Sequence, residues 1–349
     1  MGLNFTVIYP LAEMIREYLK LARSFNAVLT GVSPVMGAVS MQESNLFFLF
    51  ILFIIGFFGH SYGFVLNDIL DYNIDKDSTE IRDRPLISGT ISIKNAWVFA
   101  IISLLIPFII ALYISFTTNN YFSIIILLFS AVFITIYDLI SKKIPFMDIF
   151  VSIAIFLFIL YGVSTQVTSF SEIPVISWLV CILGAMQVLY MQIVAGGLKD
   201  IENDYEKGAK TGAIKLGVRV KNSILYVSKK FKIVAFGIQT INIILVFIPF
   251  VFISKFYTYT LLTYFQWIIL LFISILMFYL SHQLLYMGTF VRKKARKLIG
   301  SHYMIHFALV PIMLMTFNPW IGLLIFFPGL GFILSNIILH KTVLQPKTM

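Results

Sequence analysis

The sequence predicts an all-α, polytopic membrane helix bundle of nine or ten transmembrane helices. Hydrophobic residues make up 59% of the 349 residues and charged residues only 12%, and the mean hydropathy is +0.93. The apolar residues fall into long runs, several of which reach the ~20 residues needed to cross a bilayer. Because all these helices would share one packing unit, residues 1–349 are predicted to form a single transmembrane domain.

Ten apolar runs follow one another along the chain, and each is predicted to be a helix. They lie at residues 26–41, 45–67, 96–115, 121–140, 147–165, 173–198, 232–254, 261–286, 302–317 and 319–339. Only Asn318 and Pro319 mark the boundary between the last two runs. These runs are therefore either two short spans or one kinked region, which gives a count of nine or ten.

Residues 1–25 are predicted to lie on the membrane surface. In this segment apolar residues such as Leu11 and Met14 alternate with charged residues such as Glu13 and Arg16. A helix with one apolar and one charged face is typical of an interfacial amphipathic helix.

The basic residues indicate which end of the bundle faces the cytoplasm. Of the 26 Lys and Arg residues, 23 fall in segments that alternating spans place on one face, whereas the opposite loops carry only Lys255. By the positive-inside rule this basic face is cytoplasmic, and segments 68–95 and 199–231 are predicted to cap it. The net charge of +10 does not indicate nucleic-acid binding, because the charges are scattered through the loops between apolar runs.

Two acidic segments follow apolar runs and therefore end two predicted spans. In the first, Asn67, Asp71 and Asp75 lie at i, i+4 and i+8, and Asp68 lies at i−3 from Asp71. This spacing places their side chains along one side of a helix. The first segment therefore offers several oxygen ligands on one helix face.

The second acidic segment contains Asp200 and Asp204, which lie at i and i+4. Stacked like charges on a helix repel one another, and a divalent cation would remove that cost. Mg²⁺ commonly binds through one or two carboxylates together with substrate phosphates. We therefore expect the two acidic segments to face each other and to hold Mg²⁺ on a diphosphate.

With these residues the chain resembles the UbiA-type intramembrane prenyltransferase superfamily. The first family signature, Asn-Asp-x-x-Asp-x-x-x-Asp, is matched from Asn67 to Asp75, and the second, Asp-x-x-x-Asp, from Asp200 to Asp204. An Arg-Pro-Leu-x-Ser-Gly element is matched by residues 84–89. The resemblance extends from about residue 10 to about residue 290.

The chain departs from the family pattern at two places. Arg23 and Asn26 match an Arg-Pro-x-Asn element that here lacks the proline. After the fourth run the family tends to have Tyr-Ser-x-x-Leu-Lys, which Tyr137 and Lys142 match, whereas Asp138 and Ser141 depart from that element.

The resemblance implies a helix bundle around a central, lipid-open cavity and transfer of a polyprenyl group from a polyprenyl diphosphate. It implies Mg²⁺ as the cofactor, with the metal ligands Asn67, Asp71, Asp75, Asp200 and Asp204. The four aspartates of this set are the expected catalytic residues. The expected substrate-binding residues are Arg23, Asn26, Asp68, Lys76, Arg84 and Lys142. The rings of Tyr62, Tyr137 or Tyr190 would shelter the allylic cation.

The acceptor is open between two classes. An aromatic quinone precursor is favoured, and a glycerol phosphate lipid, as used by digeranylgeranylglyceryl phosphate synthases, is the alternative. A secondary transporter is the rival of another class, since intramembrane carboxylates also relay ions. The predicted partners are a polyprenyl diphosphate, a small acceptor and membrane lipid, without nucleic acid and without a prediction of oligomeric state.

Three other features receive simpler interpretations. His60 is predicted to be a hydrogen-bonded interior residue. His302 and His306 lie at i and i+4 but lack a third metal ligand. The stretch from Arg292 to Lys297 is predicted to contact anionic lipid headgroups.

Overall fold

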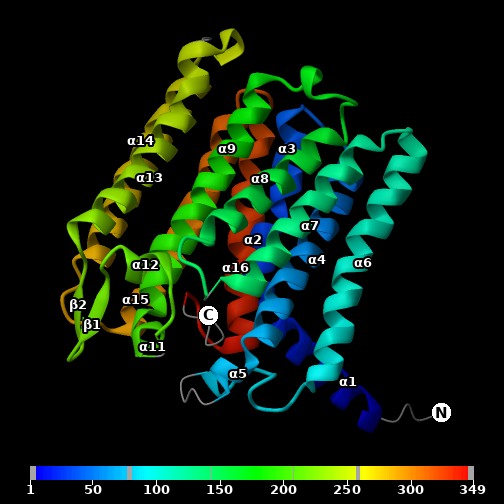
Figure 1. The fold of residues 1–349 in the computed structure, drawn as a ribbon. Coiled ribbons are helices and arrows are strands. Elements are labelled where there is room, and N and C mark those ends of the chain that lie inside the picture. The colour runs from blue at the N-terminus through cyan, green and yellow to red at the C-terminus, as the bar shows by residue number, and fades with distance from the viewer. Residues whose placement is uncertain (1–4, 77–80, 142, 207, 257–259, 345–349) are drawn as a thin grey trace.

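The computed structural model describes residues 5–76, 81–141, 143–206, 208–256 and 260–344. Long helices run roughly side by side, and short elements gather at one end of the bundle (Figure 1). We call this the polar end. Its short elements are α5 (Tyr72–Asp75), α11 (Ile201–Glu206), α12 (Gly212–Lys215), β1 (Arg219–Lys221) and β2 (Ile224–Tyr226). The predicted all-α membrane bundle is confirmed.

Eight helical stretches in the described part of the chain are long and apolar enough to cross a membrane. They are α4 (Leu46–Leu70), α6 (Ile93–Thr118), α7 (Phe122–Ile140), a stretch from α9 to α10 (Val175–Lys199), α13 (Lys229–Phe252), α14 (Leu261–Leu285), α15 (Arg292–Leu314) and a stretch (Pro319–His340) made of the 3-10 helix η5 (Pro319–Ile325) and α16 (Phe326–His340). A further apolar helix, α8 (Asp148–Ser164), has 17 residues. The last two apolar runs therefore form two separate helices.

The first apolar run differs from the expectation of one continuous span. It forms two short helices, α2 (Ser24–Thr30) and α3 (Val32–Ser40), which meet at Gly31. Pro34 lies in the first turn of α3 and has no N–H, so it cannot donate the helical hydrogen bond to the carbonyl of Thr30. Proline is tolerated in the first turn of a helix but disrupts a helix interior. Pro34 therefore favours the start of a new helix, α3, over a continuation of α2.

Close backbone contacts hold α3, α4 and α8 together. A Cβ atom on Gly162 of α8 would lie 1.9 Å from the Pro34 carbonyl oxygen, and one on Gly56 of α4 would lie 2.4 Å from the Gly31 carbonyl oxygen. Small residues let helix backbones approach closely, which is how membrane helices gain packing energy without a hydrophobic driving force. Helix α8 thereby packs between α3, α7 and α9.

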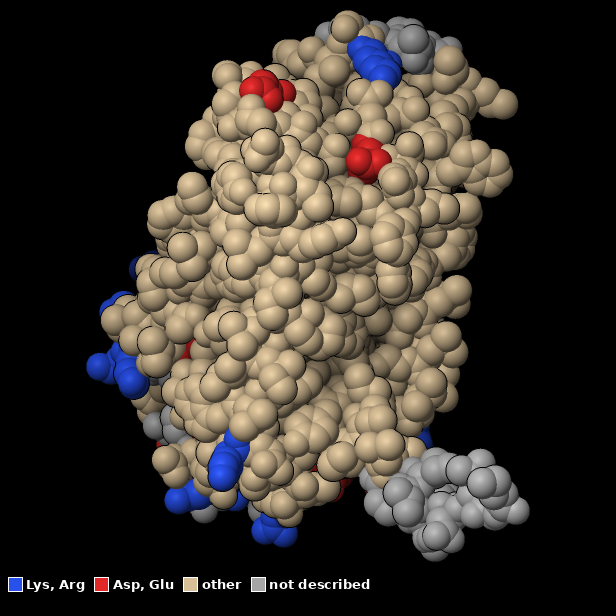
Figure 2. Space-filling model, turned by 90° about the vertical axis from the view of Figure 1, so that its right-hand side faces the viewer, with Lys and Arg blue, Asp and Glu red and all other residues tan. Residues whose placement is uncertain are grey.

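The charge distribution agrees with a membrane-embedded middle. On the face shown in Figure 2, most visible Lys and Arg residues lie over the lower part of the molecule, which is the polar end, and the middle is largely uncharged. Helix α1 (Phe5–Leu21) lies at the same end, and Leu11, Met14 and Ile15 are each about half exposed. An interfacial position of this helix stays a prediction.

A small hairpin, joined to Thr289 by an isolated bridge at Ile224, is the only two-stranded sheet in the described ranges, and the sequence analysis did not predict it. Strands β1 and β2 are antiparallel, with Val220 opposite Leu225. Asn222 and Ser223 connect them with positive φ angles of 51° and 59°, the backbone geometry of a tight hairpin turn. The hairpin lies in the predicted cap segment 199–231.

A buried polar network joins α13 and α14 to the rest of the bundle. The Tyr190 hydroxyl lies 2.7 Å from the Ser281 hydroxyl, and the Gln239 amide nitrogen lies 3.2 Å from Ser281 and 3.1 Å from His306 Nε2. These residues come from α9, α14, α13 and α15, respectively. In an apolar surrounding such contacts fix which helix faces meet.

Candidate active site

The first acidic segment lies where α4 ends and α5 begins. Helical hydrogen bonds continue across this junction, because the amide of Asp71 donates to the Asn67 carbonyl and the amide of Asp75 donates to the Asp71 carbonyl, each at 2.9 Å. The i, i+4, i+8 spacing therefore keeps the three side chains on one side of the chain. All three residues line the same cavity, and Asp71 and Asp75 are buried.

The second acidic segment follows α9 (Val175–Tyr190) after an irregular turn. Residues Met191–Gly196 form a π-helical turn, which leads into α10 (Gly197–Lys199). Such a turn inserts one residue, re-aims the side chains after it, and is frequent at functional sites. The amide of Asp204 then donates to the Asp200 carbonyl at 2.9 Å, and both residues line the cavity.

The structure brings the two acidic segments to a single cavity of about 350 Å³. The first segment contributes Asn67, Asp71 and Asp75 to its lining, and the second contributes Asp200, Asn203 and Asp204. Oxygen ligands that are far apart in the chain thus share one enclosed space.

Two arginines stand beside the first acidic segment, where buried carboxylates hold them. Arg23 Nη2 lies 2.7 Å from Asp68 Oδ1, and Arg84 Nη1 lies 2.9 Å from Asp75 Oδ2 and 3.5 Å from Asp68 Oδ1. Burial lowers the pKa of Arg23, but the neighbouring Asp68 carboxylate more than offsets this, so that the pKa lies above its ordinary value. Arg23 therefore remains cationic at the edge of the cavity.

Asp68 has a different position from the other acidic residues of its segment. It is buried between Arg23 and Arg84 and is not among the residues that line the cavity. Its carboxylate can thus orient both guanidinium groups without contacting a bound ligand.

The second acidic segment also has basic neighbours. Lys199 Nζ lies 3.1 Å from Asp200 Oδ2, and Arg292 Nη2 lies 3.0 Å from Asp200 Oδ1. Both basic residues line the cavity. The side chain of Arg292 thus turns toward an acidic residue of the cavity, and contact of the stretch from Arg292 to Lys297 with lipid headgroups stays a prediction.

The remaining predicted substrate-binding residues have different positions. Asn26 is buried and lines the cavity. Lys76 is exposed and is not among the lining residues. Lys142 lies outside the described residues.

The deeper walls of the cavity are mainly apolar. Helices α6, α7 and α8 supply this part, with lining residues that include Leu104, Phe108, Ile134, Ile155 and Phe158. The cavity therefore runs from a charged mouth at the polar end to an apolar interior.

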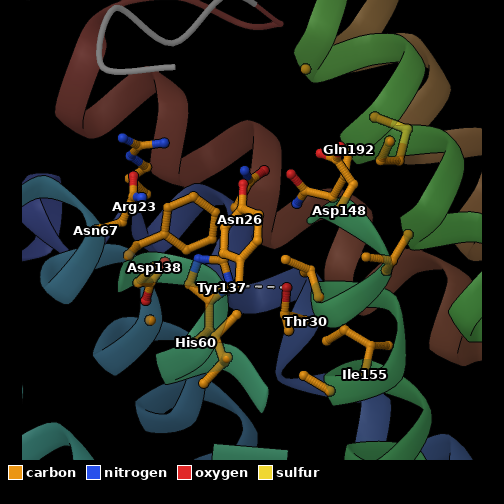
Figure 3. Close-up of a pocket in the computed structure, with 18 of the residues that line it drawn as sticks. Arg23, Asn26, Thr30, His60, Asn67, Tyr137, Asp138, Asp148, Ile155 and Gln192 are labelled. Atoms are coloured by element: carbon orange, nitrogen blue, oxygen red, sulfur yellow. Dashed lines mark hydrogen bonds between the residues drawn. The ribbon is translucent and has the colours of Figure 1, made fainter. Parts of the chain in front are cut away.

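Figure 3 shows the polar side chains at the level between these two parts. In this view Arg23, Asn67 and Asp138 lie to one side of Tyr137, and Asp148 lies to the other. Below them His60 Nδ1 lies 2.9 Å from the Thr30 hydroxyl. The predicted interior role of His60 is thus confirmed, although His60 also lines the cavity.

Two of the three tyrosines considered as cation shelters line the cavity, namely Tyr62 and Tyr137. Tyr190 is absent from the lining and is instead held in the polar network by Ser281. Within the described residues, Tyr190 therefore belongs to helix packing.

The side chains of the two acidic segments match the ligand preference of Mg²⁺. Mg²⁺ prefers oxygen ligands and commonly binds through one or two carboxylates plus phosphate oxygens, and the five predicted ligands offer carboxylate or amide oxygens to one cavity. Within the described ranges, no three His, Cys, Asp or Glu side chains are grouped so as to hold a metal ion by themselves. These residues fit a magnesium ion that shares its coordination with a bound phosphate.

The fold and the cavity define an integral membrane protein whose site suits a ligand with an anionic head and an apolar tail. The sequence matches the UbiA prenyltransferase family over residues 27–297, and the chain belongs to this family.

The curated relatives include two different kinds of prenyl-transferring enzyme. The chain is 33% identical over 165 residues to a 4-hydroxybenzoate octaprenyltransferase of Francisella tularensis, a match that covers 47% of this chain and 54% of the relative. It is 31% identical over 105 residues to the digeranylgeranylglyceryl phosphate synthase of Methanocaldococcus jannaschii, covering 30% of this chain and 36% of the relative. The matched part thus spans about half the length of the first relative.

Solved structures share the fold over most of the chain. A UbiA homologue from Aeropyrum pernix has a TM-score of 0.63 at 14% identity, covering 84% of this chain and 96% of that one. A digeranylgeranylglyceryl phosphate synthase structure has a TM-score of 0.60 at 23% identity, covering 89% and 99%. A UbiA homologue from Archaeoglobus fulgidus, bound to DMAPP and Mg²⁺, has a TM-score of 0.58 at 16% identity, covering 84% and 99%.

Sequence reasoning missed four charged residues of the cavity: Asp138, Asp148, Lys199 and Arg292. Asp138 carried a usable signal, because an ionisable residue inside an apolar run is costly and is often functional. The sequence gives no such signal for Arg292, because Arg292 is one of several basic residues in a row. Only the fold distinguishes it from its neighbours.

Proposed function

We propose that this protein transfers a polyprenyl group from a polyprenyl diphosphate to a small acceptor in a Mg²⁺-dependent reaction. The observation that carries the proposal is the shared cavity of the two acidic segments, with Arg23 and Arg84 beside them. Membership in the UbiA prenyltransferase family supports it. Solved homologues bound to DMAPP or GPP together with Mg²⁺ support the same ligand class.

The basic residues at the mouth bind the diphosphate. Arg23 and Arg84 are held by Asp68 and Asp75, so their guanidinium groups are oriented before the substrate arrives. A planar guanidinium forms paired hydrogen bonds with phosphate oxygens. Lys199 and Arg292 act from the side of the second acidic segment.

Asn67, Asp71, Asp75, Asp200 and Asp204 hold the magnesium. When bound, Mg²⁺ neutralises the diphosphate and acts as a Lewis acid on the leaving group.

The transfer breaks the bond between the first prenyl carbon and the diphosphate oxygen. Pyrophosphate leaves with the bonding electron pair, the acceptor forms the new bond to the prenyl carbon, and the acceptor loses one proton to water. Arg23 and Arg84 stabilise the charge that develops on the leaving oxygen. The ring faces of Tyr62 and Tyr137 shelter the allylic cation, and the apolar walls exclude water that would capture it.

The prenyl tail lies along the apolar part of the cavity. Its walls come from α6, α7 and α8, as described above. When the prenyl tail moves from the lipid into the cavity, its apolar surface stays out of contact with water.

For the acceptor we favour an aromatic quinone precursor. The match to a 4-hydroxybenzoate octaprenyltransferase is the longer of the two curated matches reported above. Prenylation of a glycerol phosphate lipid is the alternative, which the second relative and one solved structure support. Incubation of purified protein with Mg²⁺, geranylgeranyl diphosphate and either 4-hydroxybenzoate or geranylgeranylglyceryl phosphate, followed by mass analysis, distinguishes the two.

This assay can also contradict the proposal. A prenylated product that disappears with EDTA and returns with Mg²⁺ is the expected result. If neither acceptor is prenylated and labelled solute enters proteoliposomes instead, the transporter interpretation is correct.

We place the active site on the cytoplasmic face, on the strength of the positive-inside rule. The sequence has one cysteine, the buried Cys181, so single reporter cysteines can be introduced after Cys181→Ala. Exposed Arg82 lies between α5 and α6 at the polar end, and exposed Lys255 lies in the 3-10 helix η4 (Ser254–Phe256), between α13 and α14 at the opposite end (Figure 1). In intact cells a membrane-impermeant thiol reagent should label Lys255→Cys and not Arg82→Cys, and the reverse labelling would refute this orientation.

A further inference from the structure

Asp138 lies near the end of α7, and its side chain borders the cavity. It is 5% exposed, and its Oδ2 atom has no hydrogen-bond partner among the described residues. Asn67 of the first acidic segment also lines the cavity and lies on the same side of Tyr137 as Asp138 (Figure 3). Asp138 therefore has a buried carboxylate oxygen without a partner on the cavity wall.

Asp138 differs in this respect from the acidic residues at the mouth. Asp68 and Asp75 form ion pairs with arginines, and Asp200 forms ion pairs with Lys199 and Arg292. The ion pairs of the described residues include none for Asp138. A buried carboxylate without a counter-charge or a full set of donors is costly. A bound ligand that supplies a donor would remove part of that cost.

The position of Asp138 along α7 indicates which ligand would supply this donor. Ile134, one turn earlier, belongs to the apolar wall, and Ser141, nearly one turn later, lines the cavity toward the polar end. Asn67, which lies on the same side of Tyr137 as Asp138 (Figure 3), belongs to the first acidic segment. Asp138 therefore lies at the boundary between the diphosphate region and the prenyl region. The reacting carbon joins those two parts of the substrate, so the acceptor has to arrive at this level.

We propose that Asp138 binds the acceptor, accepting a hydrogen bond from an acceptor hydroxyl group and thereby selecting acceptors that carry one. This inference rests on the proposed function and deepens it. The carboxylate oxygen without a partner receives the hydroxyl of a phenol or of a glycerol lipid. The family element described above tends to have serine at this position, so the selection is a property of this chain.

The first test separates acceptor binding from prenyl diphosphate binding. Asp138→Asn keeps the shape of the side chain and Asp138→Ser shortens it, while Asp83→Asn, at an exposed position outside the cavity lining, is the matched control. Loss of a hydrogen bond to a charged group should lower kcat/KM for the acceptor roughly ten- to hundredfold. The KM for geranylgeranyl diphosphate should change less than threefold, on the order of the error of such comparisons. Asp138→Glu should recover part of the loss.

The second test examines the hydroxyl group itself. If the wild type prenylates 4-hydroxybenzoate, it should prefer this acceptor over 4-methoxybenzoate, and Asp138→Asn should reduce that preference more than Asp83→Asn does. If it prenylates geranylgeranylglyceryl phosphate instead, the variants should show their loss in the KM of that lipid. The wild-type preference can be measured even if the Asp138 variants do not accumulate.

Three results would overturn the inference. These are a wild type indifferent to the hydroxyl group, variants with an unchanged acceptor preference, and variants whose main defect is a higher requirement for Mg²⁺ or prenyl diphosphate. The last would make Asp138 a metal ligand. A wild type that prenylates no acceptor contradicts the proposed function itself and is thereby distinguished from all three.

Discussion

The guanidinium of Arg23 lies 2.7 Å from the carboxylate of Asp68, which ties the turn before α2 to the last turn of α4. The same carboxylate oxygen lies 3.5 Å from Arg84. One buried acid therefore orients two cations at the mouth of the cavity without lining the cavity itself. In the proposed reaction, Asp68 would therefore act on substrate binding through the two arginines and not as a metal ligand.

Asp68→Asn tests this positioning role. We expect the KM for the prenyl diphosphate to rise roughly tenfold, because each ~1.4 kcal/mol of lost interaction is a factor of ten. The free energy of unfolding should fall by about 2 kcal/mol, less than the ~3–5 kcal/mol for deleting one partner of a buried pair, since asparagine still accepts hydrogen bonds. Kinetics and thermal unfolding in detergent measure both. A fall in kcat with unchanged KM would place Asp68 in the chemical step instead.

Asp71→Ala and Asp204→Ala test the two halves of the metal site. Each variant should remain folded, because removing a carboxylate from a cluster of like charges relieves repulsion. Mg²⁺-dependent turnover should fall by roughly a thousandfold or more, as expected when a group that stabilises the transition state is lost. Turnover assays over a range of Mg²⁺ concentrations measure this. Near-wild-type turnover in either variant would show that its carboxylate is not a metal ligand.

Arg292→Ala tests a residue that only the fold identifies. Arg292 lies 3.0 Å from Asp200 and lines the cavity, whereas its neighbour Lys293 is exposed and is outside the lining. We expect a roughly ten- to hundredfold higher KM for the prenyl diphosphate in Arg292→Ala, because a charge-assisted contact is worth ~1.5–3 kcal/mol. Lys293→Ala should be unchanged. Equal effects in both variants would mean that the general positive charge of the segment matters, and not the contact.

The acidic segments could be predicted from sequence because their geometry is local. The spacing of Asn67, Asp71 and Asp75 is read on one helix, and the hydrogen bonds across the α4–α5 junction preserve that spacing. Hydropathy likewise predicts the membrane-spanning helices, because a helix needs about 20 apolar residues to cross a bilayer. The meeting of Asp71 with Asp204 at one cavity could be expected only because both segments end spans on the same predicted face.

Other parts of the site depend on tertiary contacts that no local pattern contains. The π-helical turn of Met191–Gly196 re-aims the second segment, yet its residues read as an ordinary apolar run. The break between α2 and α3 coincides with the contact of Gly31 and Gly56, which depends on a distant helix. Asp138 could have been noticed as a charge inside an apolar run, but its place on the cavity wall could not.

Tyr190→Phe tests the polar network that joins α9 and α14. The Tyr190 hydroxyl lies 2.7 Å from Ser281 and is fully buried. Its removal should lower the free energy of unfolding by about 0.6–1.7 kcal/mol, the range of hydrogen bonds between membrane helices, and leave turnover nearly intact. Tyr279→Phe is the control, because Tyr279 is 56% exposed. A large loss of turnover with unchanged stability would instead assign Tyr190 to the reaction.

Gly162→Ala tests the close contact of α8 with α3, and Gly237→Ala is its matched control. A Cβ atom on Gly162 would lie 1.9 Å from the Pro34 carbonyl oxygen, whereas one on Gly237 would meet no atom within 4 Å. The added methyl group at position 162 must therefore push α3 away from α8, and overpacking of this kind costs about 1–3 kcal/mol.

The two glycine variants should consequently shift thermal unfolding in opposite directions. Gly237→Ala should be neutral or stabilise by up to about 1 kcal/mol, because alanine favours the helix more than glycine does. Since Ser33 and Met36 of α3 line the cavity, Gly162→Ala should also raise the KM for the prenyl diphosphate. If Gly162→Ala unfolds at the wild-type temperature, α3 and α8 do not approach as closely as described, and the wall that they share must be arranged differently.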